Sequence, residues 1–403
     1  MNEDAARYAA EQAARTAHGR LVARLASRSR DIAGAEDALA EAFAAALRHW
    51  PLRGVPASPE AWLLTAARNA QRNAGRHRRV QNAAIRDLEL RQAELSAPAS
   101  DWPDDRLKLL FVCAHPAIDA AIRTPLMLQV VLGLDAARIA NALLLAPAAM
   151  GQRLVRAKAK IRDAGLRFAL PEREEMPARL AEVLEAIYAA YGTGWDGAGT
   201  LAQQPGGLAE EAIALGRLLV AELPDQPEAK GLLALMLHCE ARRGARRDAE
   251  GRFVPLVRQD TRLWARASMA EAEQLLMDGA RAGRFGRFLC EAAIQSVHAQ
   301  RATTGRTDHA ALRLLYDLLA EQAPSLGVLT ARAAALLEAG DPRAAEAALA
   351  ALPAARVVSY QPFWVTRAAL LRHQGRLAEA DEARRRAVGL TEDPAIRDFL
   401  QED

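Results

Sequence analysis

Runs in which Val, Ile or Thr alternate with polar residues, the pattern of a half-buried β-strand, are nearly absent from this 403-residue chain. Ala and Leu dominate instead, and aromatic residues make up only 5%. Ala and Leu have high helix propensities, because Ala loses no side-chain entropy and Leu loses little in a helix. The sequence therefore predicts an all-α protein, long enough for two or three domains.

Cysteine content and hydropathy indicate the compartment. The three cysteines, Cys113, Cys239 and Cys290, are widely spaced and odd in number, which fits a reducing cytosol better than a disulfide framework. No apolar run approaches the roughly 18 residues that a membrane span needs. The N-terminal sequence MNEDAARYAAEQAAR lacks the features of a signal peptide. We therefore expect a soluble, cytoplasmic protein without a membrane partner.

Four segments differ in composition. Residues 1–82 are predicted to be helical and become strongly basic at their end, and residues 106–170 repeat this pattern. Between them, residues 83–105 contain the Ser, Pro and Asp of a linker, with two Arg against six acids from Arg86 to Asp105. Residues 171–403 form a series of helical patterns separated by Gly and Pro. The sequence predicts two small helical domains, an acidic linker and a helical extension.

An internal repeat lies near the end of the chain. LLEAGDPRAAEAALAAL (336–352) aligns with LRHQGRLAEADEARRRA (371–387) at an offset of 35 residues, so that Gly340 matches Gly375. This period and the matched small residues are typical of tetratricopeptide-type helical hairpins. Earlier helices are predicted at roughly 177–191, 207–222, 227–242, 261–281, 285–299 and 308–322.

A helix, a short break and a second helix are predicted over residues 134–163. Asp135 is a plausible N-cap for the first helix, which runs to about Leu143, and Pro147 suits the first turn of the second helix. Apolar residues on the second helix recur at helical spacing and predict one buried face. These residues are Met150, Leu154, Ala157 and Ile161.

The second helix is almost entirely of one charge. Its sequence GQRLVRAKAKIRDAG (151–165) carries five cations against the single acid Asp163. In a helix-turn-helix, Arg and Gln on the second helix can contact base edges and Lys can neutralise phosphate. The alternative is a solvated basic helix in a bundle. The candidate DNA-binding residues are Gln152, Arg153, Arg156, Lys158 and Lys160. Gly151, early in this helix, should cost roughly 1 kcal/mol of helix stability.

A second basic helix is predicted in AWLLTAARNAQRNAGRHRRV (61–80). Trp62, Leu63, Ala66 and Ala70 can face a core. Five arginines and no acids lie between residues 68 and 79, namely Arg68, Arg72, Arg76, Arg78 and Arg79. Two basic helices on either side of an acidic linker favour a nucleic-acid partner, with an affinity that falls steeply with salt.

Other motifs predict no catalytic, metal or cofactor site. GTGWDG (192–197) matches the dinucleotide-binding G-x-G-x-x-G pattern, but an amphipathic helix precedes it where a strand is required, so we expect a helix C-cap and a turn. Cys113 and His115 are too few for structural zinc, which normally takes four ligands. We expect them, like His238 and Cys239, to be packing residues.

Several of these segments resemble a known family. IAGAEDALAEAFAAALRHWP (32–51) and PASPEAWLLTAARNA (56–70) resemble region 2 of bacterial extracytoplasmic-function sigma factors, members of the sigma-70 family. DDRLKLLFVCAHPAI (104–118) and LDAARIANALLLAPAAMGQRLVRAKAKIRDAG (134–165) resemble region 4. The resemblance is greatest to the subgroup with a long tetratricopeptide-type extension, and it covers nearly the whole chain.

The resemblance implies the partners and their sites. Region 2 of such factors docks on a coiled coil of the polymerase β′ subunit, and the matching residues are Glu36, Asp37, Glu41 and Phe43. Arg68, Arg72, Arg76 and Arg79 match the helix on −10 promoter DNA, and the turn 51–60 lies where an unstacked base is held. Region 4 binds the −35 element and the β flap, and the residues that match its recognition helix are Gln152, Arg153, Arg156 and Lys160.

Together these features predict a sigma factor that binds core RNA polymerase and directs promoter-specific initiation, and that is not an enzyme. The extension, residues 171–403, is predicted to regulate the two sigma domains or to bind a protein or peptide partner. An alternative is a helix-turn-helix regulator with a helical sensor domain, which would need neither the docking helix at 32–51 nor the acidic linker.

Overall fold

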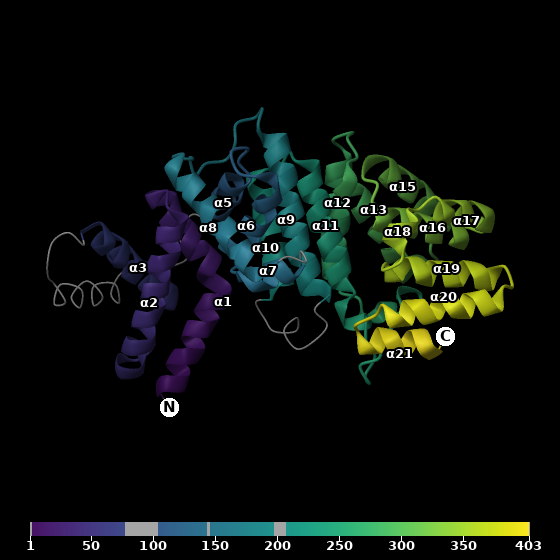
Figure 1. The fold of residues 1–403 in the computed structure, drawn as a ribbon, viewed down its shortest axis with the longest axis horizontal. Coiled ribbons are helices and arrows are strands. Elements are labelled where there is room, and N and C mark those ends of the chain that lie inside the picture. Colours follow the sequence, from purple (N-terminus) through teal and green to yellow (C-terminus); the bar gives the residue numbers. More distant parts are fainter. Residues whose placement is uncertain (1, 77–103, 143–145, 197–206, 403) are drawn as a thin grey trace. The chain divides into compact units, whose positions relative to one another are not determined.

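The computed structural model describes residues 2–76, 104–142, 146–196 and 207–402 (Figure 1). Within these ranges every regular element is a helix, and the only β-type pairing is one isolated antiparallel bridge between Arg247 and Phe253. The predicted all-α fold is therefore confirmed. The chain divides into two compact units, Met1–Leu218 and Leu219–Asp403, each of which is described by itself below.

The first three helices of unit 1 form a bundle. They are α1 (Asn2–Ser29), α2 (Ile32–Arg53) and α3 (Pro59–Arg76), and each packs against the other two. The Asp31 side chain caps α2 by accepting from the Gly34 N–H. Trp50 of α2 and Trp62 of α3 meet edge to face, with ring centroids 5.5 Å apart. The predicted core residues Trp62, Leu63, Ala66 and Ala70 are all buried.

A second group of helices contains the predicted helix-turn-helix. It comprises α5 (Arg106–Cys113), α6 (Ala120–Val130), α7 (Ala136–Ala142) and α8 (Pro147–Asp163). Asp135 caps α7, since its carboxylate accepts from the Arg138 N–H at 2.8 Å, and α8 begins at Pro147 as predicted. The predicted apolar stripe of α8, Met150, Leu154, Ala157 and Ile161, is buried.

The next two helices also begin in unit 1. Helix α9 (Met176–Asp196) packs against α5 and α6, and Arg123 of α6 pairs with Glu182 of α9 at 2.9 Å. Helix α10 (Leu208–Glu222) contributes Glu211, which forms an ion pair with Arg106 of α5. The sequence predicted that the extension begins at residue 171, but the first compact unit continues past this residue to Leu218. The boundary at 171 therefore stays a prediction about where one function ends and another begins.

The course of α9 corrects one expectation. Gly192 and Gly194 of the GTGWDG segment lie within the helix, which continues to Asp196, and not in a turn after it. Gly197 lies outside the described residues. A glycine in a helix interior costs only about 1 kcal/mol, which the packing of the preceding apolar turns of α9 offsets.

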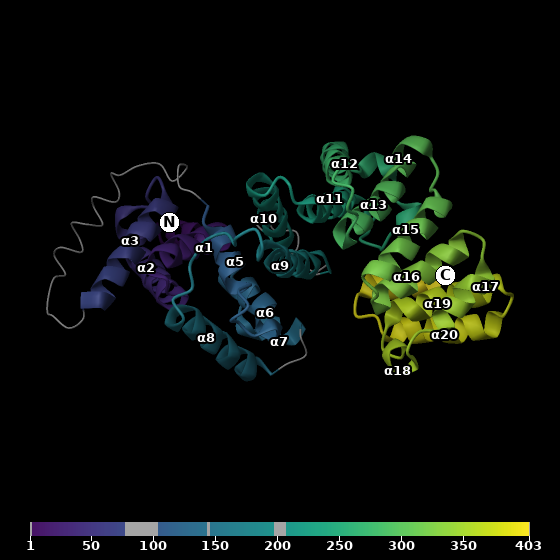
Figure 2. The same ribbon diagram turned by 90° about the horizontal axis from the view of Figure 1, so that it is seen from above.

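Unit 2 is a succession of helices (Figure 2). Three of its predicted ranges, 227–242, 285–299 and 308–322, agree with observed helices to within two residues, and the prediction for 261–281 begins too early. Residues Thr261–Leu263 form a 3₁₀ turn capped by Asp260, and the α-helix begins only at Arg266. The α-helices of unit 2 are α11 (Pro227–Ala241), α12 (Arg266–Ala280), α13 (Arg287–Ala299), α14 (Arg301–Thr304), α15 (His309–Gln322), α16 (Leu326–Glu338), α17 (Pro342–Ala350), α18 (Ala354–Val357), α19 (Gln361–His373), α20 (Leu377–Gly389) and α21 (Pro394–Glu402).

The 35-residue repeat corresponds to two helical hairpins, α16–α17 and α19–α20, which pack against each other. Gly340 and Gly375 lie in the two turns with φ of +84° and +75°, a backbone conformation that favours glycine. The matched Ala345 and Ala380 are both buried, where a small side chain lets the helices approach. The two hairpins therefore share one turn geometry, and their assignment as tetratricopeptide repeats stays a prediction.

Among the described helices, none is both long enough and apolar enough to span a membrane.

Candidate nucleic-acid interface

Helix α8 presents an open face in unit 1. Gln152, Val155 and Arg156 are exposed there and follow one another at helical spacing, on the side away from the buried Leu154. Two of the predicted DNA-binding residues, Gln152 and Arg156, thus lie where a partner can reach them. Val155 was not among the predicted DNA-binding residues, because that prediction rested on charged and hydrogen-bonding side chains and an apolar side chain is neither.

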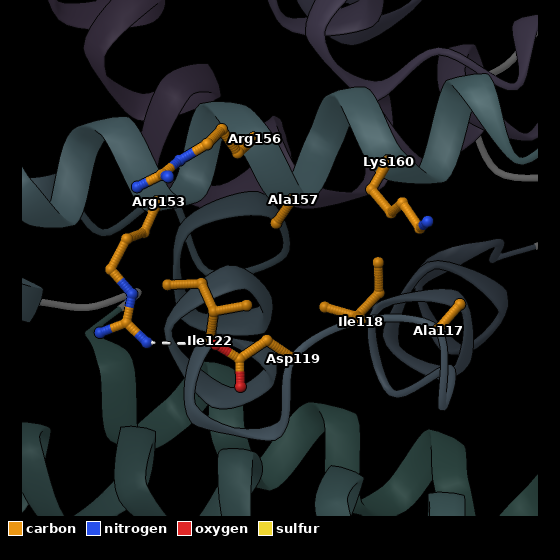
Figure 3. A pocket seen from close by; sticks show the side chains of 8 residues that line it. All are labelled: Ala117, Ile118, Asp119, Ile122, Arg153, Arg156, Ala157 and Lys160. Atoms are coloured by element: carbon orange, nitrogen blue, oxygen red, sulfur yellow. Dashed lines mark hydrogen bonds and ion pairs between the residues drawn. The ribbon is translucent and has the colours of Figure 1, made fainter.

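On one flank of this face, α8 lies beside the loop that leads into α6 (Figure 3). Arg153 reaches toward Asp119, with its Nη2 3.5 Å from the Asp119 carboxylate, whose other oxygen accepts from the Ala121 N–H at 3.1 Å. The Asp119 carboxylate therefore both caps α6 and holds Arg153. A hollow of about 440 Å³ lies here, and Arg153, Arg156 and Lys160 line it on the α8 side.

On the other flank, Lys158 pairs with Glu36 of α2. Lys158 Nζ lies 2.6 Å from Glu36 Oε2, and the two side chains are only 9% and 23% exposed. Burial raises the pKa of the Glu36 carboxyl, and the attraction and hydrogen bond of Lys158 oppose this shift. A predicted DNA-binding residue and a predicted polymerase-docking residue are therefore paired with each other, and neither is open to a partner.

The backbones of the two helix groups meet closely near this ion pair. A Cβ on Gly19 of α1 would lie 2.0 Å from the carbonyl oxygen of Val131, just after α6. The neighbouring His18 has its pKa lowered, first by burial and then by the positive charge of Lys158. The contact between α1–α2 and α6–α8 therefore depends on a glycine that no sequence pattern had singled out.

A second link joins α1 to the start of α5. The Asp105 carboxylate is almost fully buried, and it accepts hydrogen bonds from Arg24, Ser27 and Lys108 at 2.7–3.1 Å. Burial alone would raise the pKa of Asp105, but these hydrogen bonds outweigh it and the pKa is lowered. The end of the predicted acidic linker is thus fixed to the first bundle.

The predicted −10 residues are placed only in part. Arg68 is half-buried, and its pKa is lowered by burial and by the nearby Arg28, Arg24 and Arg72. Arg72 is exposed and donates to the Asn69 side chain. Arg76 ends α3, while Arg78 and Arg79 lie outside the described residues. The exposed Arg28 thus enlarges the basic surface, while Arg24 beside it is held by Asp105, and sequence spacing could not show this because Arg28 lies 40 residues before Arg68.

Three of the predicted polymerase-docking residues lie on accessible parts of α2. Asp37 and Glu41 are exposed, whereas Phe43 is half-buried. Phe43 lines a groove of about 540 Å³ between the start of α1 and the end of α2, together with Ala6, Ala10, Ala14, Leu47 and Pro51. The groove is largely apolar and can receive the apolar face of another helix.

The sulfur and imidazole groups that the sequence singled out differ in burial. Cys113 is fully buried, which raises the pKa of its thiol, and His238 is 1% exposed. Both are packing residues as predicted. His115 differs, because its Nδ1 accepts from the Ala117 N–H at 3.1 Å and so supports a turn. Within the described ranges, no cluster of three or more His, Cys, Asp or Glu side chains has the arrangement to hold a metal ion.

Comparison with known proteins adds two family matches. Residues 15–81 match the model for sigma-70 region 2, and residues 179–280 match a family of unknown function (DUF6596). A protein of Rhizobium meliloti (strain 1021), called "Uncharacterized protein R00370", is 37% identical over 363 residues, which cover 88% of this chain and 86% of that protein. No solved structure matches this chain.

Proposed function

This chain belongs to the sigma-70 family and to the same protein family as R00370 of Rhizobium meliloti. On this premise we propose that it binds core RNA polymerase and directs the polymerase to specific promoters. The match of residues 15–81 to sigma-70 region 2 is the observation that carries the proposal. It favours a sigma factor over a helix-turn-helix regulator without a polymerase partner. Members of the sigma-70 family are initiation factors and not enzymes, and we place this one in the cytoplasm, where the polymerase works.

The docking site on the polymerase is proposed to be α2. Its exposed Asp37 and Glu41, and Phe43 in the apolar groove, fit a mixed polar and apolar contact with the β′ coiled coil. Glu36 belongs to the same surface, but it becomes available only when Lys158 releases it.

The basic surfaces are proposed to hold the promoter. Arg68 and Arg72 on α3, with the arginines that follow, would contact the −10 element, and the open face of α8 would enter the major groove of the −35 element. Lys158 and Lys160 would contribute phosphate contacts once Lys158 is free. The β flap is the expected protein contact of residues 106–170.

The unit 1 structure supports a closed free form. Docking of α2 on polymerase would compete with the Lys158–Glu36 pair, so we propose that polymerase binding separates α8 from α2. Because Arg123–Glu182 and Arg106–Glu211 attach α9 and α10 to the same helix group, the extension is in a position to bias this equilibrium. We propose that the extension regulates unit 1 by shifting this equilibrium, and that the chain belongs to an extracytoplasmic-function subgroup with a regulatory extension. Its hairpins α16–α17 and α19–α20 are proposed to bind a protein or peptide.

Reconstitution tests the proposal. The full chain should co-purify with core polymerase and support run-off transcription from the region upstream of its own gene. Arg156→Ala should reduce transcription while leaving co-purification unchanged, because Arg156 lies on the face remote from α2. Binding to DNA without any association with core polymerase would instead establish the helix-turn-helix regulator.

A further inference from the structure

An exposed valine stands in the middle of the open face of α8. Val155 is 66% exposed, whereas the other large apolar residues of the helix, Met150, Leu154 and Ile161, are at most 1% exposed. Burying a valine side chain stabilises a folded protein, and the mostly exposed Val155 contributes little of this stabilisation to the free chain. Its contribution is therefore available to a partner.

The neighbours of Val155 determine what kind of partner fits. Gln152 lies one turn earlier on the same face and Arg156 follows directly, and both are exposed. Ala159, one turn later, has a small side chain, so the surface beside the valine is shallow. Arg153 and Lys160 on the flank add positive charge that complements a phosphate backbone. Duplex DNA supplies both an apolar group for Val155 and phosphates for the exposed Arg156 and Lys160, so it fits this face as a whole.

In the major groove, each exposed group on this face has a matching base edge. Gln pairs with the N6 and N7 of adenine, Arg pairs with the O6 and N7 of guanine, and an apolar side chain contacts the C5-methyl group of thymine. Thymine is the one base that presents an apolar group in this groove. A branched side chain between Gln152 and Arg156 therefore matches a thymine beside the bases that these two residues contact.

We propose that Val155 is a specificity-determining residue, which contacts the C5-methyl group of one thymine in the −35 element. This inference rests on the proposed function, because it requires that α8 enters promoter DNA. It goes further because it names one base of the −35 element, a thymine, that is recognised by an apolar contact and not by charge.

Replacing thymine by uracil provides the test, because uracil lacks only the methyl group. The holoenzyme is made from core polymerase and the full chain. It first selects a −35 element from duplexes in which the −35 region is randomised. Each selected thymine is then replaced by uracil in turn, and binding is measured. One replacement should weaken binding by wild type about fourfold, equivalent to the roughly 0.8 kcal/mol of one buried methyl group.

The Val155→Ala holoenzyme, which lacks the two γ-methyl groups of valine, should bind the thymine duplex more weakly than wild type and should distinguish uracil from thymine at that position less than wild type does. Val358→Ala is the matched control, since Val358 is also a highly exposed valine, 64%, but lies in unit 2. It should keep the full sensitivity to uracil. Lys160→Ala should weaken binding to both duplexes equally and lower the salt dependence.

The inference is overturned if the selected element contains no thymine, if no uracil replacement weakens wild-type binding, or if Val155→Ala retains the wild-type sensitivity. In these three outcomes the holoenzyme still forms and selects DNA, so the proposed function stands. Failure of the chain to bind core polymerase or to select any duplex would overturn both.

Discussion

Lys158 Nζ lies 2.6 Å from Glu36 Oε2, and this ion pair joins the helix proposed to read the −35 element to the helix proposed to dock on polymerase. The pair is largely shielded from water, and burial raises the pKa of Glu36 even beside the lysine. Half-buried pairs add little net stability because the cost of desolvation offsets their attraction. Their geometry instead specifies one arrangement of the two helices, and a partner that binds either residue can displace the other.

Removal of Glu36 should open unit 1. In Glu36→Ala the 9%-exposed Lys158 loses its partner, which should cost between the roughly 1 kcal/mol of a surface pair and the roughly 3–5 kcal/mol of a fully buried one. Fluorescence energy transfer between dyes on Arg48→Cys of α2 and Arg162→Cys of α8, two exposed positions, reports the separation. A lower transfer efficiency than in wild type is expected.

Two further variants make this prediction specific. Asp37→Asn removes an exposed charge one residue away and should leave the transfer efficiency unchanged. The double variant Glu36→Leu/Lys158→Leu should restore the closed form, because apolar residues of similar volume can replace a buried ion pair without loss of stability. An unchanged transfer efficiency in Glu36→Ala would show that the pair does not hold α8 against α2.

Two glycines of unit 1 should respond in opposite directions to alanine. Gly19→Ala places a methyl group against the Val131 carbonyl and should destabilise the contact between α1 and α6 by roughly 1–3 kcal/mol. Gly151→Ala has no heavy atom within 4 Å of the added Cβ and should stabilise α8 by about 0.5–1 kcal/mol. Urea unfolding of both variants measures the difference. Equal effects would contradict the close approach at Gly19.

The first helices of the extension should be required for the stability of the predicted −35-binding domain. Helix α9 buries Leu180, Val183, Leu184 and Ile187, each at most 4% exposed, and packs on α5 and α6. A chain ending at residue 170 should therefore expose apolar surface, bind a hydrophobic dye and melt at a lower temperature. A chain ending at residue 224 retains α9 and α10 and should not. Equal melting temperatures would show that α9 is dispensable.

Unit 2 should lose stability in mild acid. Burial lowers the pKa of His238 to about 4, against 6.5 for an unperturbed histidine. Because the folded pKa is the lower one, the unfolded chain takes up the proton first as the pH falls. The stabilisation is therefore complete above pH 6.5 and is lost between pH 6.5 and 4, by on the order of 3 kcal/mol in total.

Urea unfolding at pH 7.5 and 5.0 measures this loss. The fall in the free energy of unfolding should be smaller in His238→Leu than in wild type, and the exposed His373→Leu serves as the control. Burial also lowers the pKa of His298 to about 4, so part of the pH dependence should remain in His238→Leu. A His238→Leu profile that superimposes on the wild-type profile would refute the assignment to His238.

Local patterns were read correctly wherever a single helix decides the outcome. The Asp135 cap, Pro147 at the start of α8 and the buried stripe from Met150 to Ile161 all follow from interactions between residues within about one or two turns of each other. The 35-residue repeat likewise indicated two hairpins, since Gly340 and Gly375 mark turns that need a positive φ. The predictions of a turn at 192–196 and of a helix at 261–265 were wrong, because tertiary packing overrides weak helix signals.

By itself, the sequence determined an all-α chain, the pair of helices within residues 134–163 and two basic helices, because propensity, periodicity and charge act over a few residues. Only the tertiary structure decided which of those charges are free. Lys158 and Glu36 are 122 residues apart, and Arg153 and Asp119 are 34 apart, so no local pattern relates them. Whether a cation faces solvent or a carboxylate depends on how the helices pack, and that packing divides one basic helix into an open face and two occupied flanks.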